Sequence, residues 1–278
     1  MTRTAIIAAL PGELKPLVRG WQHESRNGVD LWRWQYGQGE WIAACAGAGV
    51  DAATRAFAEA EQYGPATCVL SVGWAGALNS DFKPGLAYRV TGVIDARTGE
   101  RFETADCAAR EEDGRAHPSR KDNDAARVGH PKLSEVGHPE SSQVGHPSVL
   151  LVTSSKVADH AEKQRLAASY GAGLVDMEAA AVARLAEARG IPFACCKGVS
   201  DGFTDQLPDF NRFISENGKF QLFRFIVFVL VRPSHWPALI RMGENSKKAA
   251  QGIGESLLDI LDEEGFIRKR NAYPNRRS

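Results

Sequence analysis

The chain has 278 residues, and its 34 Lys and Arg residues balance its 34 Asp and Glu residues, so the formal net charge is zero. This balance argues against a nucleic-acid-binding protein, which would carry a basic excess. The length and a hydrophobic share of 43% suffice for one domain with a substantial core.

The N-terminus and the cysteines favour a cytoplasmic protein. The apolar run at residues 5–10 is too short for a signal peptide and is interrupted by Pro11 and Gly12. The five cysteines are odd in number and lack metal-ligand spacing, which favours buried, reduced thiols. They are Cys45, Cys68, Cys107, Cys195 and Cys196.

The first hundred residues predict strands that alternate with helices. A strand at residues 4–10 precedes Pro11-Gly12-Glu13, which opens a helix. A hairpin is expected at residues 31–45, and a glycine turn then leads into a helix at residues 52–62. A buried strand at residues 67–72 ends in a glycine-rich loop, and the next strand covers residues 86–94.

The second half continues the alternation and places acids at strand ends. The expected elements are strands at residues 149–153, 174–175 and 192–199, a helix at residues 159–169 and a helix that starts at Met177 and includes the Ala-rich residues 179–188. Because ligands bind at the carboxyl ends of strands in open α/β sheets, Glu13, Glu178 and Asp201 are expected in one pocket. The residues alone leave open that each is an ordinary first-turn or turn acid, with Asp176 as a helix cap.

Two motifs carry a resemblance to a known family. Val175-Asp176-Met177-Glu178-Ala179 and Ser200-Asp201 resemble the paired signatures of the purine nucleoside phosphorylase and nucleosidase superfamily, in particular the methylthioadenosine/S-adenosylhomocysteine nucleosidases. The resemblance covers residues 3–100 and 148–200. It implies a three-layer α/β/α fold with a central mixed, largely parallel sheet.

The resemblance also implies an activity, the hydrolytic cleavage of the N-glycosidic bond of an adenine-type purine nucleoside. It makes Asp201 the acid at the purine N7, Glu13 the base that activates water, and Glu178 the ligand of the ribose hydroxyls. No metal or organic cofactor is expected, and the family implies a homo-oligomer, a dimer. The other substrate-binding residues that it implies are Met177, Ser200, Gly73, Trp74, Ala75, Gly76 and Val157.

This sequence departs from the family pattern at the positions that hold phosphate and at the position that stacks on the purine. Ser71 and Trp74 stand where hexameric phosphorylases place an Arg and a Ser for phosphate, and without the arginine phosphate loses its bidentate partner. Water is therefore the favoured nucleophile, and phosphorolysis with phosphate as co-substrate is the alternative.

Val157 stands where the family has an aromatic residue that stacks on the purine, and Trp74 offers a replacement face. A non-catalytic nucleoside-binding protein is a further alternative.

The C-terminal part resembles that of the hopanoid-associated phosphorylases, which act on an adenosylated lipid. Residues 220–231 are strongly apolar but too short to span a bilayer, and a helix is expected at residues 234–250. We favour a buried helix over the sheet, with peripheral membrane contact through residues 220–231 as the alternative. The basic tail at residues 266–278 is expected to be solvated.

The sequence predicts one domain, formed by residues 1–104 and 148–265, with an insertion at residues 105–147. This insertion is polar and contains Val-Gly-His-Pro three times, starting at Val128, Val136 and Val144. Such a repeat lacks a core-forming pattern, which predicts a disordered segment.

Deletion of residues 108–146, with a short Gly/Ser linker in their place, is expected to leave the melting temperature within a few degrees of wild type. The reason is that loop length changes stability slowly, by about 0.6 kcal/mol per doubling. A thermal melt checks this. A large loss of stability, or zinc binding by His130, His138 and His146, would show that the segment is structural.

Overall fold

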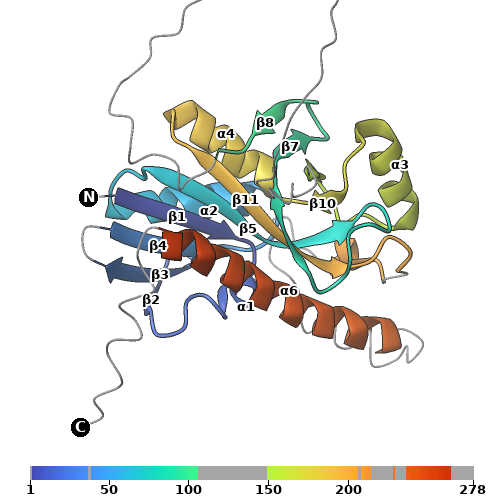
Figure 1. Ribbon diagram of the computed structural model, residues 1–278, viewed down its shortest axis with the longest axis horizontal. Coiled ribbons are helices and arrows are strands. Elements are labelled where there is room, and N and C mark those ends of the chain that lie inside the picture. Colours follow the sequence, from blue (N-terminus) through green and yellow to red (C-terminus); the bar gives the residue numbers. More distant parts are fainter. Residues whose placement is uncertain are drawn as a thin grey trace, which may run out of the picture. The chain divides into compact units, whose positions relative to one another are not determined.

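The structure is a computed structural model that describes residues 2–36, 39–105, 149–205, 208–213, 228 and 236–263 (Figure 1). The predicted insertion lies outside these residues except for residue 105. The apolar segment at 220–231 also lies outside them except for residue 228, and so does the basic tail. The predictions for these three segments therefore stay predictions.

Parallel strands form the centre of the sheet. Strand β1 (Thr2–Ala8) lies between β4 (Gly39–Cys45) and β5 (Cys68–Ala77) and runs parallel to both. Strand β5 is also parallel to β11 (Phe193–Asp201). These strands are nearly continuous apolar runs because both faces of a central parallel sheet are buried.

Antiparallel strands flank this centre. On one edge, β3 (Val29–Tyr36) pairs with β4 and with β2 (Gln22–Arg26). Beyond β11 lies β6 (Ala87–Val90), and elsewhere β7 (Gly92–Asp95) pairs with β8 (Arg101–Glu103). Within the described residues the eleven strands form a single mixed sheet, as predicted.

The sheet branches at the carboxyl end of β5. Strand β9 (Leu150–Thr153) is parallel to both β7 and β10 (Leu174–Asp176). At Gly76, β5 faces Val175 of β10 on one side and Asp201 of β11 on the other. The carboxyl ends of β5, β10 and β11 therefore converge.

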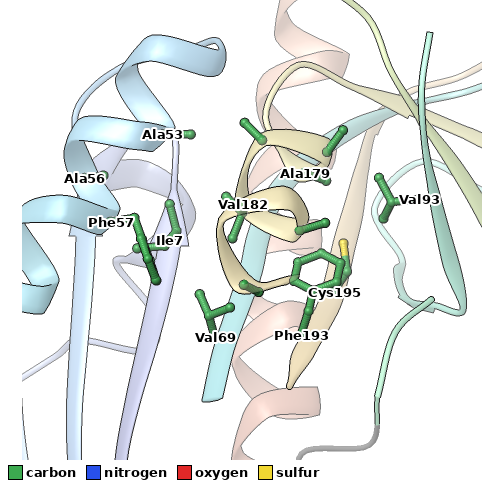
Figure 2. Packing of buried hydrophobic residues seen from close by; sticks show 14 of the residues in the cluster. Ile7, Ala53, Ala56, Phe57, Val69, Val93, Ala179, Val182, Phe193 and Cys195 are labelled. Atoms are coloured by element: carbon green, nitrogen blue, oxygen red, sulfur yellow. The ribbon is translucent and has the colours of Figure 1, made fainter. Parts of the chain in front are cut away.

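Helices cover both faces of the sheet. One face packs against α2 (Val50–Ala60) and α4 (Ala179–Arg189), whose apolar side chains lie beside those of the strands in Figure 2. The opposite face packs against α1 (Pro11–Leu14) and α6 (Trp236–Glu263). The remaining long helix, α3 (His160–Tyr170), covers a third cluster. The three-layer α/β/α prediction is confirmed.

Several boundaries differ from those predicted; α4, for example, begins at Ala179 and not at Met177. The glycine-rich segment after residue 72 continues β5, because β11 and β10 supply its hydrogen-bond partners. The strand predicted at residues 86–94 is divided at Thr91 into β6 and β7. The last helix runs on to Glu263 as the 28-residue α6. No helix of the described ranges, α6 included, is long and apolar enough to cross a membrane.

The cysteine prediction is correct for three residues and wrong for one. Cys45, Cys195 and Cys196 are free and buried, and burial raises the pKa of each thiol. Cys68, however, is disulfide-bonded, so the expectation of five reduced thiols does not hold.

Helix α6 approaches β11 closely because Gly198 lacks a side chain. A Cβ on Gly198 would lie 2.7 Å from the Cβ of Ala249 and 2.9 Å from its carbonyl oxygen. Backbone atoms cannot move aside as a flexible side chain would, so this contact fixes the spacing between helix and strand.

Gly198→Ala is expected to destabilise the protein by about 1–3 kcal/mol, because overpacking a well-packed contact displaces backbone. The matched control is Gly243→Ala on α6, where a Cβ meets nothing within 4 Å. That change should be neutral or stabilise the helix by up to about 1 kcal/mol. Urea unfolding of both variants checks the pair, and equal midpoints would contradict the close-packing argument.

Candidate active site

A cavity of about 270 Å³ lies where β5, β10 and β11 converge. The structure brings every predicted site residue except Gly73 to its wall. These residues are Glu13, Trp74, Ala75, Gly76, Val157, Met177, Glu178, Ser200 and Asp201. The roles that the resemblance gives them stay predictions, but their common location is a fact of the fold.

Glu13 is held rigidly by backbone groups. Its Oε2 accepts hydrogen bonds from the amides of Ala9 and Leu10, at 2.8 and 2.9 Å, and its Oε1 accepts one from Trp74 at 2.9 Å. Burial raises the pKa of Glu13 above its usual value, and these amides oppose the shift. A fixed carboxylate with a raised pKa is suited to accept a proton.

Gly73 leaves room for the carboxyl group of Glu13. Its φ of +141° lies in a region that favours glycine, and a Cβ there would lie 2.9 Å from Oε1 of Glu13. Gly73 therefore acts through Glu13 and not as part of the cavity wall.

Glu178 lies at the N-cap of α4, where the chain leaves β10. Its Oε1 accepts a hydrogen bond from the amide of Gly49 at 2.7 Å. Burial, and then the nearby charge of Asp176, raise the pKa of Glu178 to about 7, while Lys197 opposes the shift. Near neutral pH this carboxyl is both hydrogen-bond donor and acceptor, which suits a ligand with hydroxyl groups.

Asp176, predicted as a helix cap, also forms a buried ion pair that the sequence did not reveal. Its Oδ2 accepts from the amide of Ala179 at 2.9 Å and from Nζ of Lys197 at 2.8 Å. Thr153 donates to Oδ1 at 2.7 Å. Lys197 is only 1% exposed; burial opposes its charge, but Asp176 and other acids raise its pKa above the usual value. A single lysine within an apolar strand was the available signal for this pair.

Asp201 pairs with a second buried lysine. Nζ of Lys163, on α3, donates to Oδ2 of Asp201 at 2.5 Å and to the carbonyl of Gly202 at 2.7 Å. The hydroxyl of Ser200 donates to Oδ1 at 2.6 Å. Lys163 lines the cavity and is 2% exposed. Lys163 was not predicted from the sequence, because a lysine on a polar helix is usually an ordinary surface residue.

The remaining wall is largely apolar. Trp74 is fixed by a 2.9 Å hydrogen bond from its indole N–H to the carbonyl of Ser246 on α6. Phe210 and Met242, both missed from the sequence, line the cavity beside Val157. Phe210 thus adds an aromatic ring near the position where the expected stacking residue is absent.

Of the two positions at which hexameric phosphorylases hold phosphate, Ser71 is buried away from the cavity and Trp74 lies in its wall. Ser71 lies within β5, is 1% exposed and does not line the cavity.

Sequence comparison assigns the family. Residues 3–221 match the model of the Phosphorylase superfamily, so the chain belongs to that superfamily. It is an enzyme of the nucleosidase and nucleoside phosphorylase class. No curated protein sequence matches the chain significantly.

Solved structures share the fold at low sequence identity. The 5′-methylthioadenosine/S-adenosylhomocysteine nucleosidase of Helicobacter pylori, with butyl-thio-DADMe-Immucillin-A, has a TM-score of 0.63 and 16% identity over 95% of this chain and 99% of its own. The Neisseria meningitidis nucleosidase, in complex with methylthio-immucillin-A, gives 0.60 and 17% over 94% and 99%. The futalosine hydrolase of Helicobacter pylori gives 0.62 and 16% over 94% and 98%. The predicted resemblance is confirmed for the fold, and the hopanoid-associated resemblance stays a prediction.

The pKa of Glu178 predicts how stability depends on pH. Because that pKa is about 7 in the folded chain against 4.5 ordinarily, the folded carboxyl retains a proton that the unfolded chain has released. The stability that this proton contributes is complete below about pH 4.5 and is lost as the pH rises to about 7. Glu178→Gln, which does not titrate, should therefore gain about 2–3 kcal/mol relative to wild type between pH 5 and pH 8.

Urea unfolding of both proteins at pH 5 and pH 8 measures this difference. The hydrogen bond from Gly49 favours the charged carboxylate, so its effect on the pH dependence is already part of the pKa of Glu178, and the amide oxygen of Gln can still accept this bond. A difference between variant and wild type that does not change with pH would contradict the raised pKa.

Proposed function

We propose that the protein hydrolyses the N-glycosidic bond of a purine nucleoside of the adenine type. The observation that carries this proposal is the gathering of Glu13, Glu178 and Asp201 around one cavity of nucleoside size. The reaction requires a nucleophile at C1′, stabilisation of a cationic sugar and a proton for the departing base. Glu13 can accept the proton of attacking water, Glu178 can bind and stabilise the sugar, and Asp201 marks the end of the cavity at which the base would be protonated.

Each acid has a distinct part in the proposed step. As the bond from C1′ to the base breaks, its electron pair moves to the base, which is protonated at the Asp201 end of the cavity. Glu178 binds the ribose hydroxyls and stabilises the positive charge on the sugar. Glu13 accepts a proton from the water that attacks C1′. Acid and base contributions of this kind are each worth about 10²–10⁴-fold.

The charges of the cavity favour water over phosphate. No arginine is among its described lining residues, and of its two lysines Lys163 is engaged by Asp201 and Lys156 interacts with the charge of Glu162. The carboxylates of Glu13 and Glu178 would repel a phosphate dianion. Phosphorolysis is the alternative, and it would yield a sugar 1-phosphate with an absolute requirement for phosphate.

The apolar wall supports a substrate with an apolar 5′ group. Besides Val157 and Phe210, which lie near the expected purine-stacking position, Met242 lines the cavity with a flexible apolar side chain. A 5′-thioether such as that of methylthioadenosine, which is bound in the active site of a Helicobacter pylori relative, has matching chemistry.

Asp201→Asn should lower kcat by at least about a hundredfold, because the departing purine is then no longer protonated efficiently at this end of the cavity. The exposed Asp51→Asn on α2 is the matched control and should behave as wild type. Methylthioadenosine, S-adenosylhomocysteine, adenosine and inosine are incubated with each protein, with and without phosphate, and the products are identified. Near wild-type turnover by Asp201→Asn would refute the assignment of Asp201, and a sugar 1-phosphate product would refute hydrolysis.

A further inference from the structure

Lys163 is a cavity residue to which the mechanism above gives no part. It reaches from α3 to the carboxyl end of β11 and is 2% exposed. Its ammonium carries three hydrogens, of which Asp201 and the carbonyl of Gly202 take two. One N–H therefore remains for a ligand in the cavity that Lys163 lines.

The hydrogen bonds of Asp201 mark it as an acceptor. Its Oδ2 accepts from the ammonium of Lys163 and its Oδ1 accepts from the hydroxyl of Ser200. A carboxylate that is ion-paired with a lysine is ionised, and an ionised carboxylate has no proton to give. Of these two groups, only the ammonium of Lys163 therefore carries a proton that it can donate to a ligand.

The packing around the pair brings Lys163 to this place. A Cβ on Gly76 would lie 3.1 Å from Oδ2 of Asp201 and 3.2 Å from Cε of Lys163. A side chain at this branch point of the sheet would therefore crowd both partners, and Gly76 leaves the space in which Lys163 and Asp201 meet.

We propose that Lys163 supplies the proton to the departing base and that Asp201 orients the lysine; this inference rests on the proposed function. As the C1′–N bond breaks, its electron pair moves into the base, and a proton passes from Nζ of Lys163 to a ring nitrogen of the base. Lys163 is left as a neutral amine that still donates to Asp201 and Gly202. It regains a proton from solvent after the base has left.

A lysine suits this position for a physical reason. A neutral amine is tolerated in a buried apolar site more easily than an ammonium, and the carboxylate of Asp201, left without its counter-charge, favours the return of a proton to Lys163 from solvent. Asp201 stays a carboxylate throughout, which explains why both of its oxygens are engaged by donors.

The competing role for Lys163 is purely structural, as a counter-charge for buried Asp201. Lys163→Arg separates the two roles, because an arginine retains the positive charge but does not release its proton. With methylthioadenosine as substrate, Lys163→Arg should keep a melting temperature near that of wild type and a KM within a few-fold, while kcat falls at least about a hundredfold. A kcat within tenfold of wild type would overturn the proposal.

Lys163→Met gives a second, independent readout with two substrates. The nitrophenolate of 4-nitrophenyl β-D-ribofuranoside leaves without a proton, whereas the purine requires one. Turnover of methylthioadenosine should fall at least about a hundredfold, and turnover of the nitrophenyl riboside less than tenfold. Equal losses with both substrates would show a structural role and overturn the proposal.

Controls separate the possible failures. Lys247→Arg and Lys247→Met change an exposed lysine of α6 outside the cavity and should match wild type. If a single variant fails to fold, the variant with both Lys163→Met and Asp201→Asn, which removes both charges, takes its place and should show the same difference between substrates. A wild type that cleaves neither substrate would refute the proposed function itself, whereas an unexpected result confined to the variants would refute only the part of Lys163.

Discussion

Four acidic side chains that are themselves largely buried line one cavity, and two buried lysines compensate part of their negative charge. Lys197 joins β11 to Asp176 at the end of β10, and Lys163 joins α3 to Asp201 at the end of β11. Breaking a buried ion pair by removing one partner costs about 3–5 kcal/mol, because a charge is left without compensation. The two pairs therefore hold together the strand ends from which the site is built.

The remaining two acids depend on this framework. The charge of Lys197 lowers the pKa values of both Glu13 and Glu178, against a larger upward effect of burial. The protonation of Glu13 and Glu178 is thus set partly by a lysine that is not among the lining residues of the cavity. Backbone amides complete the balance, since Glu13 and Glu178 both accept hydrogen bonds from main-chain N–H groups.

The sequence predicts the acids of the site but not their partners. Glu13, Glu178 and Asp201 follow strands, and the topology of α/β sheets gathers such positions at one edge whatever the details of packing. Lys163 obeys no comparable rule, because its direction depends on how α3 docks on the sheet. Lys197 was accessible in principle, since a charged residue inside an apolar strand is rarely buried unless it is paired.

The same distinction explains the strand boundaries. Glycines after residue 72 indicate a loop when only local preference is considered, yet they continue β5 because neighbouring strands complete their hydrogen bonds. There Gly73 makes room for Glu13, and Gly76 makes room for Asp201 and Lys163. Glycine in this strand reflects close approach by side chains, which cannot be read from one segment alone.

Helix α6 connects the stability of the fold with the shape of the cavity. Its contact with β11 at Ala249 and its hydrogen bond to Trp74 through Ser246 lie one turn apart. Met242, a further turn toward the N-terminus, reaches the cavity wall. Since a helix rises about 1.5 Å per residue and moves largely as a rigid rod, these contacts set the position of Met242 at the cavity wall. The size of the cavity can therefore change through a small residue of β11 that lies against α6, Gly198, while every acid stays in place.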